Sequence, residues 1–248
     1  VNDFDVKVSY GTQGNASIGD YSSLGLMSTS TNYNENTALA LSQPLNPSLT
    51  WEKQKLFTAG INGRLWNRFD FDISYYVRKT SNMLMDVPYP YTTGFSSVTS
   101  NVGELQNSGI DVRLGVDIVR TKDYFVNFST TFNYNKMKVT SLFDGRNRWE
   151  VANTMVAYVV GSPVMYYLPL YAGVDPTDGA PMWYKAGDNK DVTTKSETTK
   201  DFQEAALTQN SGKKRYAPVN GCFGLNAGWK GFTVEADFSY VLGKYLVN

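Results

Sequence analysis

Histidine is absent from this 248-residue sequence, and cysteine occurs once, at Cys222. The lack of histidine excludes Ser-His-Asp and Cys-His catalysis and every metal site that needs a histidine ligand. A single cysteine cannot form an internal disulfide. Charge is scarce and balanced, because 23 Lys and Arg match 23 Asp and Glu and together make up 19% of the residues. Since no basic excess is present to attract nucleic acid, we expect no nucleic-acid partner.

A helical membrane span is also lacking. The stretch 151–174 carries no charged residue and is long enough to cross a bilayer as a helix. However, Gly161, Pro163 and Pro169 interrupt it, and proline and glycine destabilise the interior of a helix. We therefore expect short strands and turns in this stretch.

What the sequence does contain is two-residue periodicity, the pattern of a strand with one apolar and one polar face. It is clearest in 68–78, where an apolar or aromatic residue stands at every second position from Phe69 to Val77. Seven strands are predicted near residues 3–10, 56–65, 68–78, 109–119, 123–137, 219–230 and 232–243. We expect an all-β fold in which residues 1–248 form one domain.

The connections between these strands alternate between short and long. The long ones cover residues 11–55, 79–108 and 139–218. In an antiparallel up-and-down meander, all short turns then lie at one end and all long loops at the other. Transmembrane β-barrels of the outer-membrane type have this layout, with short periplasmic turns and long extracellular loops. Because seven strands leave two open edges, which lipid does not tolerate, we interpret the chain as part of a larger barrel.

Aromatic residues mark both ends of the apolar faces. Those near the short turns are Phe69, Tyr124, Trp229 and Phe232, and those near the long loops are Tyr10, Tyr75, Tyr134 and Tyr240. At ~3.3 Å per residue and ~40° of tilt, the segment from Phe232 to Tyr240 spans roughly 20 Å of the membrane normal. This approaches the apolar band of ~25 Å that aromatic girdles flank in such barrels. These residues are candidates for two membrane girdles.

The polar faces of the strands would line the lumen. Candidate wall residues are Asp70, Asp72, Asp111, Arg113, Asp117, Asn127, Asn133, Glu235 and Asp237. Carboxylates two residues apart on a strand are ~7 Å apart on an open, wet wall, which does not favour acid-base catalysis. We therefore expect no enzyme activity, and we expect Arg113 to face Asp70 or Asp72 across neighbouring strands.

Aromatic residues in the long loops are the candidates for contacts with a substrate or a lid protein. They are Tyr89, Tyr91, Phe95, Trp149, Tyr166, Tyr167, Trp183 and Tyr184. Such rings could stack on sugars or clamp a peptide, and loops on a rigid scaffold are where binding usually resides. The alternative is that they pack the loops together.

Two further features have simple interpretations. The sequence DPTDG at 175–179 lacks the acidic spacing of a calcium loop and is ordinary turn chemistry, so no metal or other cofactor is expected. Cys222 lies on the polar phase of its strand and is expected to be a small wall residue.

Six segments in order resemble the SusC/RagA group of TonB-dependent outer-membrane transporters, near the C-terminal part of the barrel. They are SYGTQGN (9–15), LNPSLTWEKQ (45–54), FDISYYVRKTSNML (71–84), NVGELQNSGIDVRL (101–114), YAGVDPTDGAPMWY (171–184) and WKGFTVEADFSYVLG (229–243). The resemblance implies a 22-stranded plugged barrel in the outer membrane of a Gram-negative bacterium, with loops at the cell surface. It also implies a SusD-like lid lipoprotein, energy from TonB through an N-terminal part, and import of oligosaccharides or peptides.

Three other functions are compatible with parts of the pattern. A soluble β-sandwich that binds glycans or mediates adhesion would have the same alternation, with the apolar phase forming its core. A passive porin would have the same barrel without TonB or a lid. A secreted enzyme is the weakest alternative, because the sequence contains no recognisable nucleophile-base or metal constellation.

Overall fold

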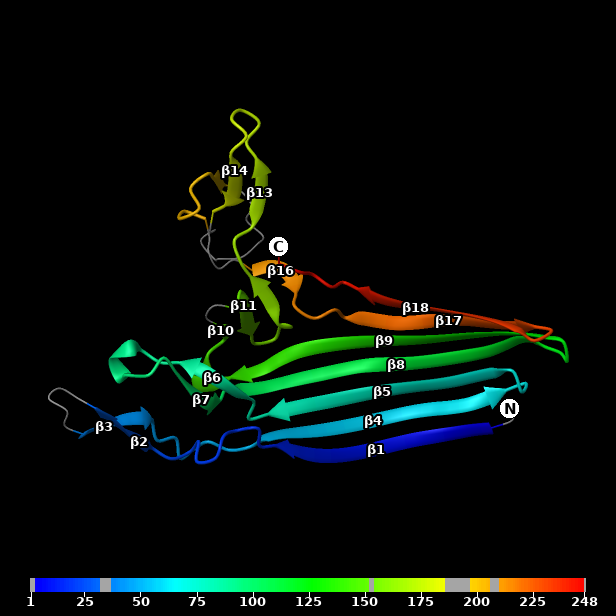
Figure 1. Cartoon of the computed structure of the whole chain (residues 1–248), viewed down its shortest axis with the longest axis horizontal. Helices are drawn as coiled ribbons and strands as arrows, with labels where there is room; N and C mark the ends of the chain where they lie inside the picture. Colours follow the sequence, from blue (N-terminus) through cyan, green and yellow to red (C-terminus); the bar gives the residue numbers. More distant parts are fainter. Residues whose placement is uncertain (1–2, 32–36, 152–153, 186–196, 206–209, 248) are drawn as a thin grey trace.

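The fold is described from a computed structural model, in which residues 3–31, 37–151, 154–185, 197–205 and 210–247 are described. Seven long strands form one twisted sheet that runs along most of the molecule (Figure 1). They are β1 Asp3–Asn15, β4 Glu52–Leu65, β5 Phe69–Ser81, β8 Gly103–Arg120, β9 Tyr124–Leu142, β17 Val219–Trp229 and β18 Phe232–Leu242. The helical content of these described ranges is two 3-10 turns, η2 Tyr91–Thr93 and η3 Phe143–Gly145, so the all-β prediction is confirmed.

The strands follow one another across the sheet in the order β1-β4-β5-β8-β9-β17-β18, and every neighbouring pair is antiparallel. This is an up-and-down meander, as the loop pattern predicts. The three short turns lie at one end of the sheet and the long connections at the other (Figure 1). Strands β1 and β18 form the two edges of the sheet, so these seven strands leave the barrel open.

Two of the short turns have the backbone geometry of tight hairpins. Trp66 (φ 51°) and Asn67 (φ 55°) join β4 to β5, and Lys230 (φ 45°) and Gly231 (φ 91°) join β17 to β18. Positive φ at both central residues is the property of a type I′ turn, whose twist matches that of the flanking strands. These turns fix the register of each hairpin and therefore determine which side chains share a face.

Five strands extend further toward the long loops than the alternation predicts. Strand β1 continues to Asn15, β4 begins at Glu52, β5 continues to Ser81, β8 begins at Gly103 and β9 continues to Leu142. Most residues of these extensions are polar, as in GTQGN at 11–15, and the apolar Leu105, Val139 and Leu142 of β8 and β9 are buried beneath the loops. With few apolar residues to mark a lipid-facing side, the backbone ladder continues without apolar alternation, so the expected strand ends were too early.

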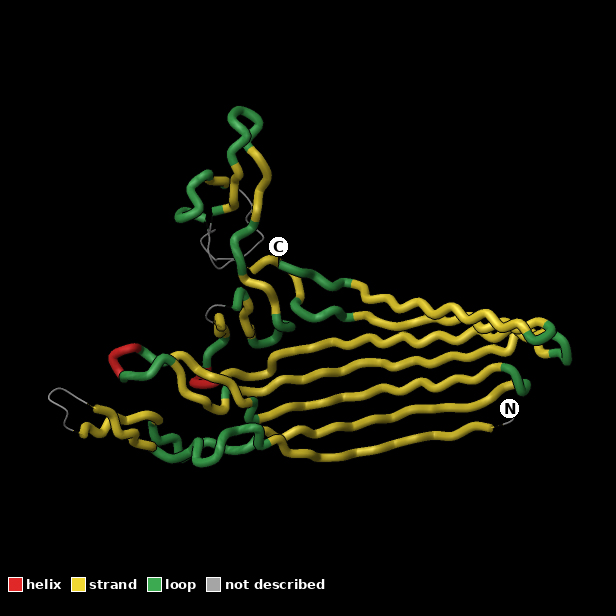
Figure 2. Tube along the Cα trace, in the orientation of Figure 1, coloured by secondary structure: helices red, strands yellow, loops and turns green. Residues whose placement is uncertain are grey.

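The long connections contain small sheets of their own rather than irregular chain (Figure 2). Hairpins are formed by β2 Leu26–Thr31 with β3 Thr37–Gln43 and by β6 Leu84–Pro88 with β7 Ser97–Asn101. A four-stranded sheet comprises β10 Arg148–Val151, β11 Val156–Val159, β12 Met165–Tyr167 and β16 Asn210–Lys214. A three-stranded sheet comprises β13 Tyr171–Val174, β14 Pro181–Tyr184 and β15 Thr198–Thr199.

The uncharged stretch 151–174 is thus divided among short strands and turns, as expected, with residues 152–153 outside the described ranges. No helix among the described residues is long and apolar enough to cross a membrane.

The hydrophobic core lies at the end of the sheet where the long loops are. Val102 and Val139 are fully buried there, and Leu105, Trp149 and Val164 complete the same cluster with other loop residues. Leu105 and Val139 oppose each other in the β8–β9 ladder. They belong to the same face as Asp111 and Asn133 further along these strands. The loops therefore pack onto the polar face of the sheet.

Candidate functional site

The register brings the predicted wall residues together on one face of the sheet. Asp72 opposes Arg113 between β5 and β8, Asp117 opposes Asn127 between β8 and β9, and Asn226 opposes both Asn127 and Glu235. This face also carries Asp70, Asp111, Asn133 and Asp237. The expected opposition of Arg113 and Asp72 is therefore present, although the Asp72 carboxylate pairs with Lys7 of β1 at 3.4 Å.

Arg64 is the centre of an ion-pair network on this polar face. Its guanidinium lies 3.4 Å from Asp70 Oδ1 and 3.5 Å from Asp117 Oδ2, and Arg120 lies 3.8 Å from the same Asp117 oxygen. Sequence analysis did not single out Arg64, although its position on the polar phase of 56–65 was the available signal. Arg64 and Asp70, together with Asp72 and Arg113, border an open hollow of about 620 Å³.

Asparagine amides extend this network along β8, β9 and β17. The amide of Asn133 donates to Asp111 Oδ1, and the amide of Asn220 donates to Asn133 Oδ1 at 3.2 Å. The Oδ1 atoms of Asn127 and Asn226 are buried and lack a hydrogen-bond partner among the described residues. Such a wall presents many acceptors and donors to a polar solute or to a covering domain.

Two of the predicted contact residues in the loops are buried. The Trp149 side chain is 4% exposed, stacked on Tyr158 at 5.7 Å and in edge contact with Phe143 at 5.4 Å between ring centroids. Tyr167 is also buried, beneath the guanidinium of Arg148. Their burial favours the alternative, that these two rings pack the loops together, over contact with a substrate or a lid.

Three of the other predicted aromatic residues border hollows, Tyr89 one of them and Tyr166 and Trp183 another. Tyr89 is 42% exposed beside a hollow of about 540 Å³ that Pro90, Phe143 and Arg146 also border, and Phe95 is half-buried. The backbone of Tyr91 lies in η2, and its side chain is outside the described part of the structure.

Tyr166 and Trp183 border a second, mainly apolar groove of about 520 Å³. Tyr171, Phe202 and Lys213 line the same groove, and Phe202 meets Trp183 edge-on at 5.1 Å between ring centroids. Sequence analysis overlooked these three residues, because they lie in short or weakly patterned segments. Tyr184 is half-buried next to Trp183 in β14.

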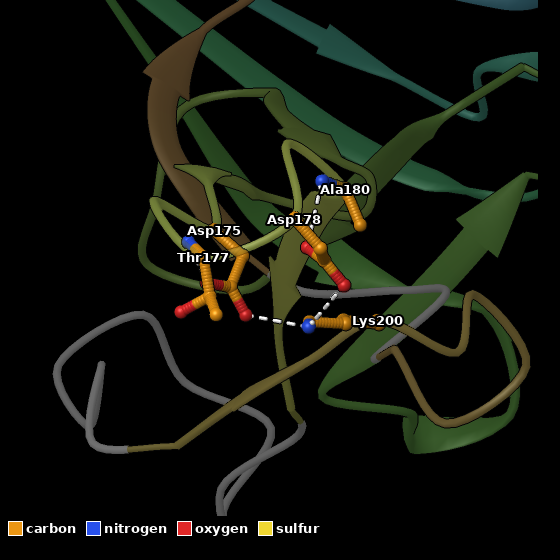
Figure 3. Close-up of polar contacts among 5 residues, drawn as sticks. All are labelled: Asp175, Thr177, Asp178, Ala180 and Lys200. Atoms are coloured by element: carbon orange, nitrogen blue, oxygen red, sulfur yellow. Dashed lines mark hydrogen bonds and ion pairs between the residues drawn. The ribbon is translucent and has the colours of Figure 1, made fainter.

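The DPTDG segment forms the turn between β13 and β14, and a lysine holds it. Lys200 Nζ lies 2.5 Å from Asp175 Oδ2 and 2.8 Å from Asp178 Oδ2 (Figure 3). The other oxygen of each carboxylate accepts a backbone N–H, from Thr177 at 2.8 Å and from Ala180 at 3.0 Å. The turn therefore contains its own cation, and the described residues include no acidic, histidine or cysteine cluster suited to a metal ion.

These contacts change the pKa values of the turn. The hydrogen bond from Lys200, together with those from Thr177, lowers the pKa of Asp175 to about 2. The hydrogen bond from Lys200 also lowers the pKa of Asp178, and the two aspartates raise the pKa of Lys200. All three groups are therefore charged at neutral pH, and Lys200 stays paired with both aspartates.

Comparison with known proteins identifies the family. The sequence model of the family described as TonB dependent receptor-like, beta-barrel matches residues 1–229. The chain belongs to this TonB-dependent receptor β-barrel family. The family is a receptor and transporter class rather than an enzyme class, and its members reside in the outer membrane of Gram-negative bacteria.

Individual relatives of this TonB-dependent receptor chain support the resemblance to the SusC/RagA group. TonB-dependent receptor P26 of Formosa agariphila is 35% identical over 141 residues, which is 55% of this chain and 14% of that protein. TonB-dependent receptor SusC of Bacteroides thetaiotaomicron is 30% identical over 154 residues, which is 58% of this chain and 15% of that protein. The chain thus spans a small part of the curated relatives that it matches.

Solved structures match this chain along its entire length or nearly so. The structure of the RagAB peptide transporter superposes with a TM-score of 0.88 at 38% identity, covering 100% of this chain and 27% of that one. The RagAB peptide importer in the open-open state gives a TM-score of 0.85 over 98% of this chain and 26% of that one. The predicted membership of the SusC/RagA group is confirmed.

The predicted girdle residues lie on the apolar face of this barrel segment. Phe232, next to the β17–β18 turn, is 75% exposed, and Trp229, Tyr124, Tyr10 and Tyr75 are exposed as well. Phe69, Tyr134 and Tyr240 share the apolar phase of their strands. Large exposed apolar side chains on this face suit contact with lipid, and their role as two girdles stays a prediction.

Proposed function

We propose that this chain forms part of the wall and the extracellular loops of a TonB-dependent importer that works with a SusD-like lid lipoprotein. The observation that carries the proposal is the match of the entire chain to the RagAB peptide transporter at a TM-score of 0.88. The strands supply the wall, and the long loops supply the mouth. TonB would act through an N-terminal part of the same transporter.

Peptides are our first candidate for the substrate class, and oligosaccharides the second. The chain is 38% identical to the RagAB peptide transporter across its whole length, against 30% identity to SusC over 58% of the chain. The polar face also carries both signs of charge, with Arg64 beside Asp70 and Asp117 and Lys7 beside Asp72. Paired charges of both signs suit a zwitterionic peptide better than a neutral sugar.

The loop packing supports a narrowed mouth. The core around Val102, Val139 and Trp149 holds the loops over the polar face of β8 and β9. Side chains that remain exposed on these loops, such as Tyr89, and those that border the apolar groove, such as Trp183, are the candidates for substrate or lid contact. A soluble β-sandwich is not favoured, because the described residues leave the apolar face of the sheet exposed rather than covered by a second sheet.

Uptake by cells that carry the full-length transporter tests the proposal. Labelled peptides and labelled oligosaccharides would be supplied separately, with TonB present or deleted. We expect peptide uptake that requires TonB, whereas a passive porin would keep its uptake after TonB is deleted. Tyr89→Ala should reduce uptake several-fold, and Tyr21→Ala serves as the control, since Tyr21 is an exposed loop tyrosine away from that hollow. Equal uptake by both variants would contradict the assignment of Tyr89.

A further inference from the structure

Lysines gather on the apolar face of the sheet, just beyond the tyrosines at its loop end. Tyr75 and Tyr134 stand opposite Ile110 on neighbouring strands, and Lys79 and Lys138 follow them four residues further along the same phase. At ~3.3 Å per residue and ~40° of tilt, four residues advance roughly 10 Å along the membrane normal. These lysines thus lie where the headgroups of the lipids begin if the tyrosines mark the interface. We call the whole set the basic belt: Lys53, Lys55, Lys79, Lys136 and Lys138 of the sheet, with Lys214 of β16.

The register places charges of the same sign directly opposite one another. Lys55 pairs with Lys79, and Lys79 and Lys138 both pair with Gln106, so three lysines share one row across four strands. Like charges opposite each other destabilise a sheet unless something neutralises them. All five sheet lysines of the basic belt are exposed.

No carboxylate neutralises the basic belt within the described residues. The ion pairs there involve other lysines, Lys7, Lys185 and Lys200. The remaining described residues on this part of the face include one carboxylate, the exposed Glu104 two residues from Gln106, which forms no ion pair with a lysine of the belt, and the uncharged Thr12, Gly14, Ser81, Gln106 and Ser108. On the polar face, by contrast, Lys7 and Arg64 pair with aspartates. The excess of positive charge is therefore specific to the lipid side of the loop end.

A hollow adjoins the basic belt. Lys136, Lys138 and Lys214 line a space of about 200 Å³, together with Tyr134 and Tyr216. Three lysines and two tyrosines around an open space are suited to a phosphate group, because both kinds of side chain donate hydrogen bonds.

We propose that the basic belt binds the phosphate groups of glycolipid headgroups in the outer leaflet of the outer membrane. The position of the lysines, on the lipid-facing side and immediately beyond the tyrosines, selects a lipid headgroup over a soluble anion. Clusters of four to eight lysines or arginines next to a membrane span commonly bind anionic headgroups. The inference rests on the proposed orientation, in which the long loops face the cell exterior.

The test uses the full-length transporter purified in detergent and titrated with lipid A that carries its phosphates, or with enzymatically dephosphorylated lipid A. Native mass spectrometry would count the bound lipid. We expect lipid A to bind only when it carries its phosphates. The double variant Lys79→Gln, Lys138→Gln should bind phosphorylated lipid A at least tenfold more weakly, because each lysine is expected to contribute about fivefold to the affinity. The matched control is Arg68→Gln with Lys122→Gln, which removes two exposed charges at the opposite end of the strands.

Binding that is equal for both lipids, or equal in the parent and the Lys79/Lys138 variant, would overturn the proposal. Loss of lid association in this variant with unchanged lipid binding would also overturn it and assign the lysines to a protein partner. TonB-dependent uptake by the parent is measured separately in cells. Absence of uptake with intact phosphate-dependent binding would contradict the proposed function alone, so the two failures are distinguishable.

Discussion

The seven-stranded sheet and the loop cluster at its end bury their apolar side chains in opposite ways. In the loop cluster, Val102 and Val139 are entirely buried among other protein side chains. On the apolar face of the sheet, Val8 and Val234 are more than half exposed. The same residue type is therefore covered by protein in one region and left for lipid in the other. The loop cluster has a core suited to water, whereas the sheet depends on the bilayer.

This difference separates two sources of stability within one chain. The sheet is held by continuous backbone ladders, which need no packed core in order to persist in lipid. The loop cluster has short strands, such as β10 and β11 of four residues each, so it depends on side-chain packing. Damage to one region should therefore leave the other largely intact.

Truncation of Trp149 should produce the largest local effect. Trp149→Ala removes a buried indole that contacts Phe143 and Tyr158, and such a truncation costs about 3–5 kcal/mol. We expect the loop cluster to become sensitive to protease while the barrel of the full-length transporter still migrates as a folded species on an unheated gel. Loss of the folded barrel band would show that the two regions are not separable.

A charge on the lipid-facing side tests the other half of the comparison. Ala236→Arg places a cation on the apolar phase of β18 near its middle, and arginine at mid-bilayer costs about 2–4 kcal/mol. The control is Ser239→Arg on the polar phase of the same strand, which we expect to cost much less. Urea unfolding of the full-length transporter in liposomes measures both. Equal destabilisation would contradict the assignment of the two faces.

Removal of Arg64 should change selectivity more than stability. Its partners Asp70 and Asp117 are partly exposed, and pairs of this kind contribute at most about 1 kcal/mol. Arg64→Met leaves Asp70 without its cation and Asp117 with Arg120 alone, so we expect conductance in planar bilayers to shift toward cations. Arg68→Met, at the neighbouring turn, is the control. An unchanged cation-to-anion ratio would place Arg64 away from the conducting path.

Acid should break the ion pairs of Lys200 with Asp175 and Asp178 at the β13–β14 turn, and this is the smallest of the expected effects. Because the pKa of Asp175 is lowered to about 2 on folding, its contribution is present above its unfolded pKa of ~3.9 and is lost as the pH falls toward 2. Hydrogen exchange of the Thr177 and Ala180 amides, normalised to an unstructured peptide, should be constant from pH 7 to about 4 and faster below.

Substitution of the lysine gives the same readout at neutral pH. Lys200→Met should raise exchange of the Thr177 and Ala180 amides and leave the barrel unchanged, whereas Lys213→Met, which lies over the Tyr245 ring, should not affect them. Identical exchange in both variants would show that the conformation of the turn does not depend on Lys200.

The strands of the sheet could be predicted because each one carries its own signal. Lipid on one side and water on the other impose alternation on every membrane-level strand, as in Phe69 to Val77. The strand extensions that reach Ser81 in β5 and begin at Glu52 in β4 escaped prediction, because their residues are polar and show no apolar alternation. The small loop sheets escaped for another reason, since most of their strands have only two to five residues and are too short to show a period.

The candidate contact residues were less predictable than the wall. Polar wall positions follow from the phase of each strand, so Arg113 is expected to face Asp70 or Asp72, and the register selects Asp72. An aromatic residue in a loop does not belong to an alternating apolar and polar pattern that would show which way it faces. Trp149 and Tyr89 therefore look alike in sequence, although Trp149 is buried and Tyr89 is exposed. The partnership of Lys200 with Asp175 joins residues far apart in the chain and has no local signature.

The sequence by itself determined the two-faced strands, the short turns at one end and the family. The strands and turns follow from local alternation, and the family follows from six sequence segments that occur in a fixed order. Tertiary structure alone decided which loop aromatics are buried, where the loop core lies and which charges are neighbours. Register converts scattered residues into rows, so the clustering of Lys55, Lys79 and Lys138 on one face follows only from the pairing of the strands. Contacts between distant segments are set by packing, which no local pattern encodes.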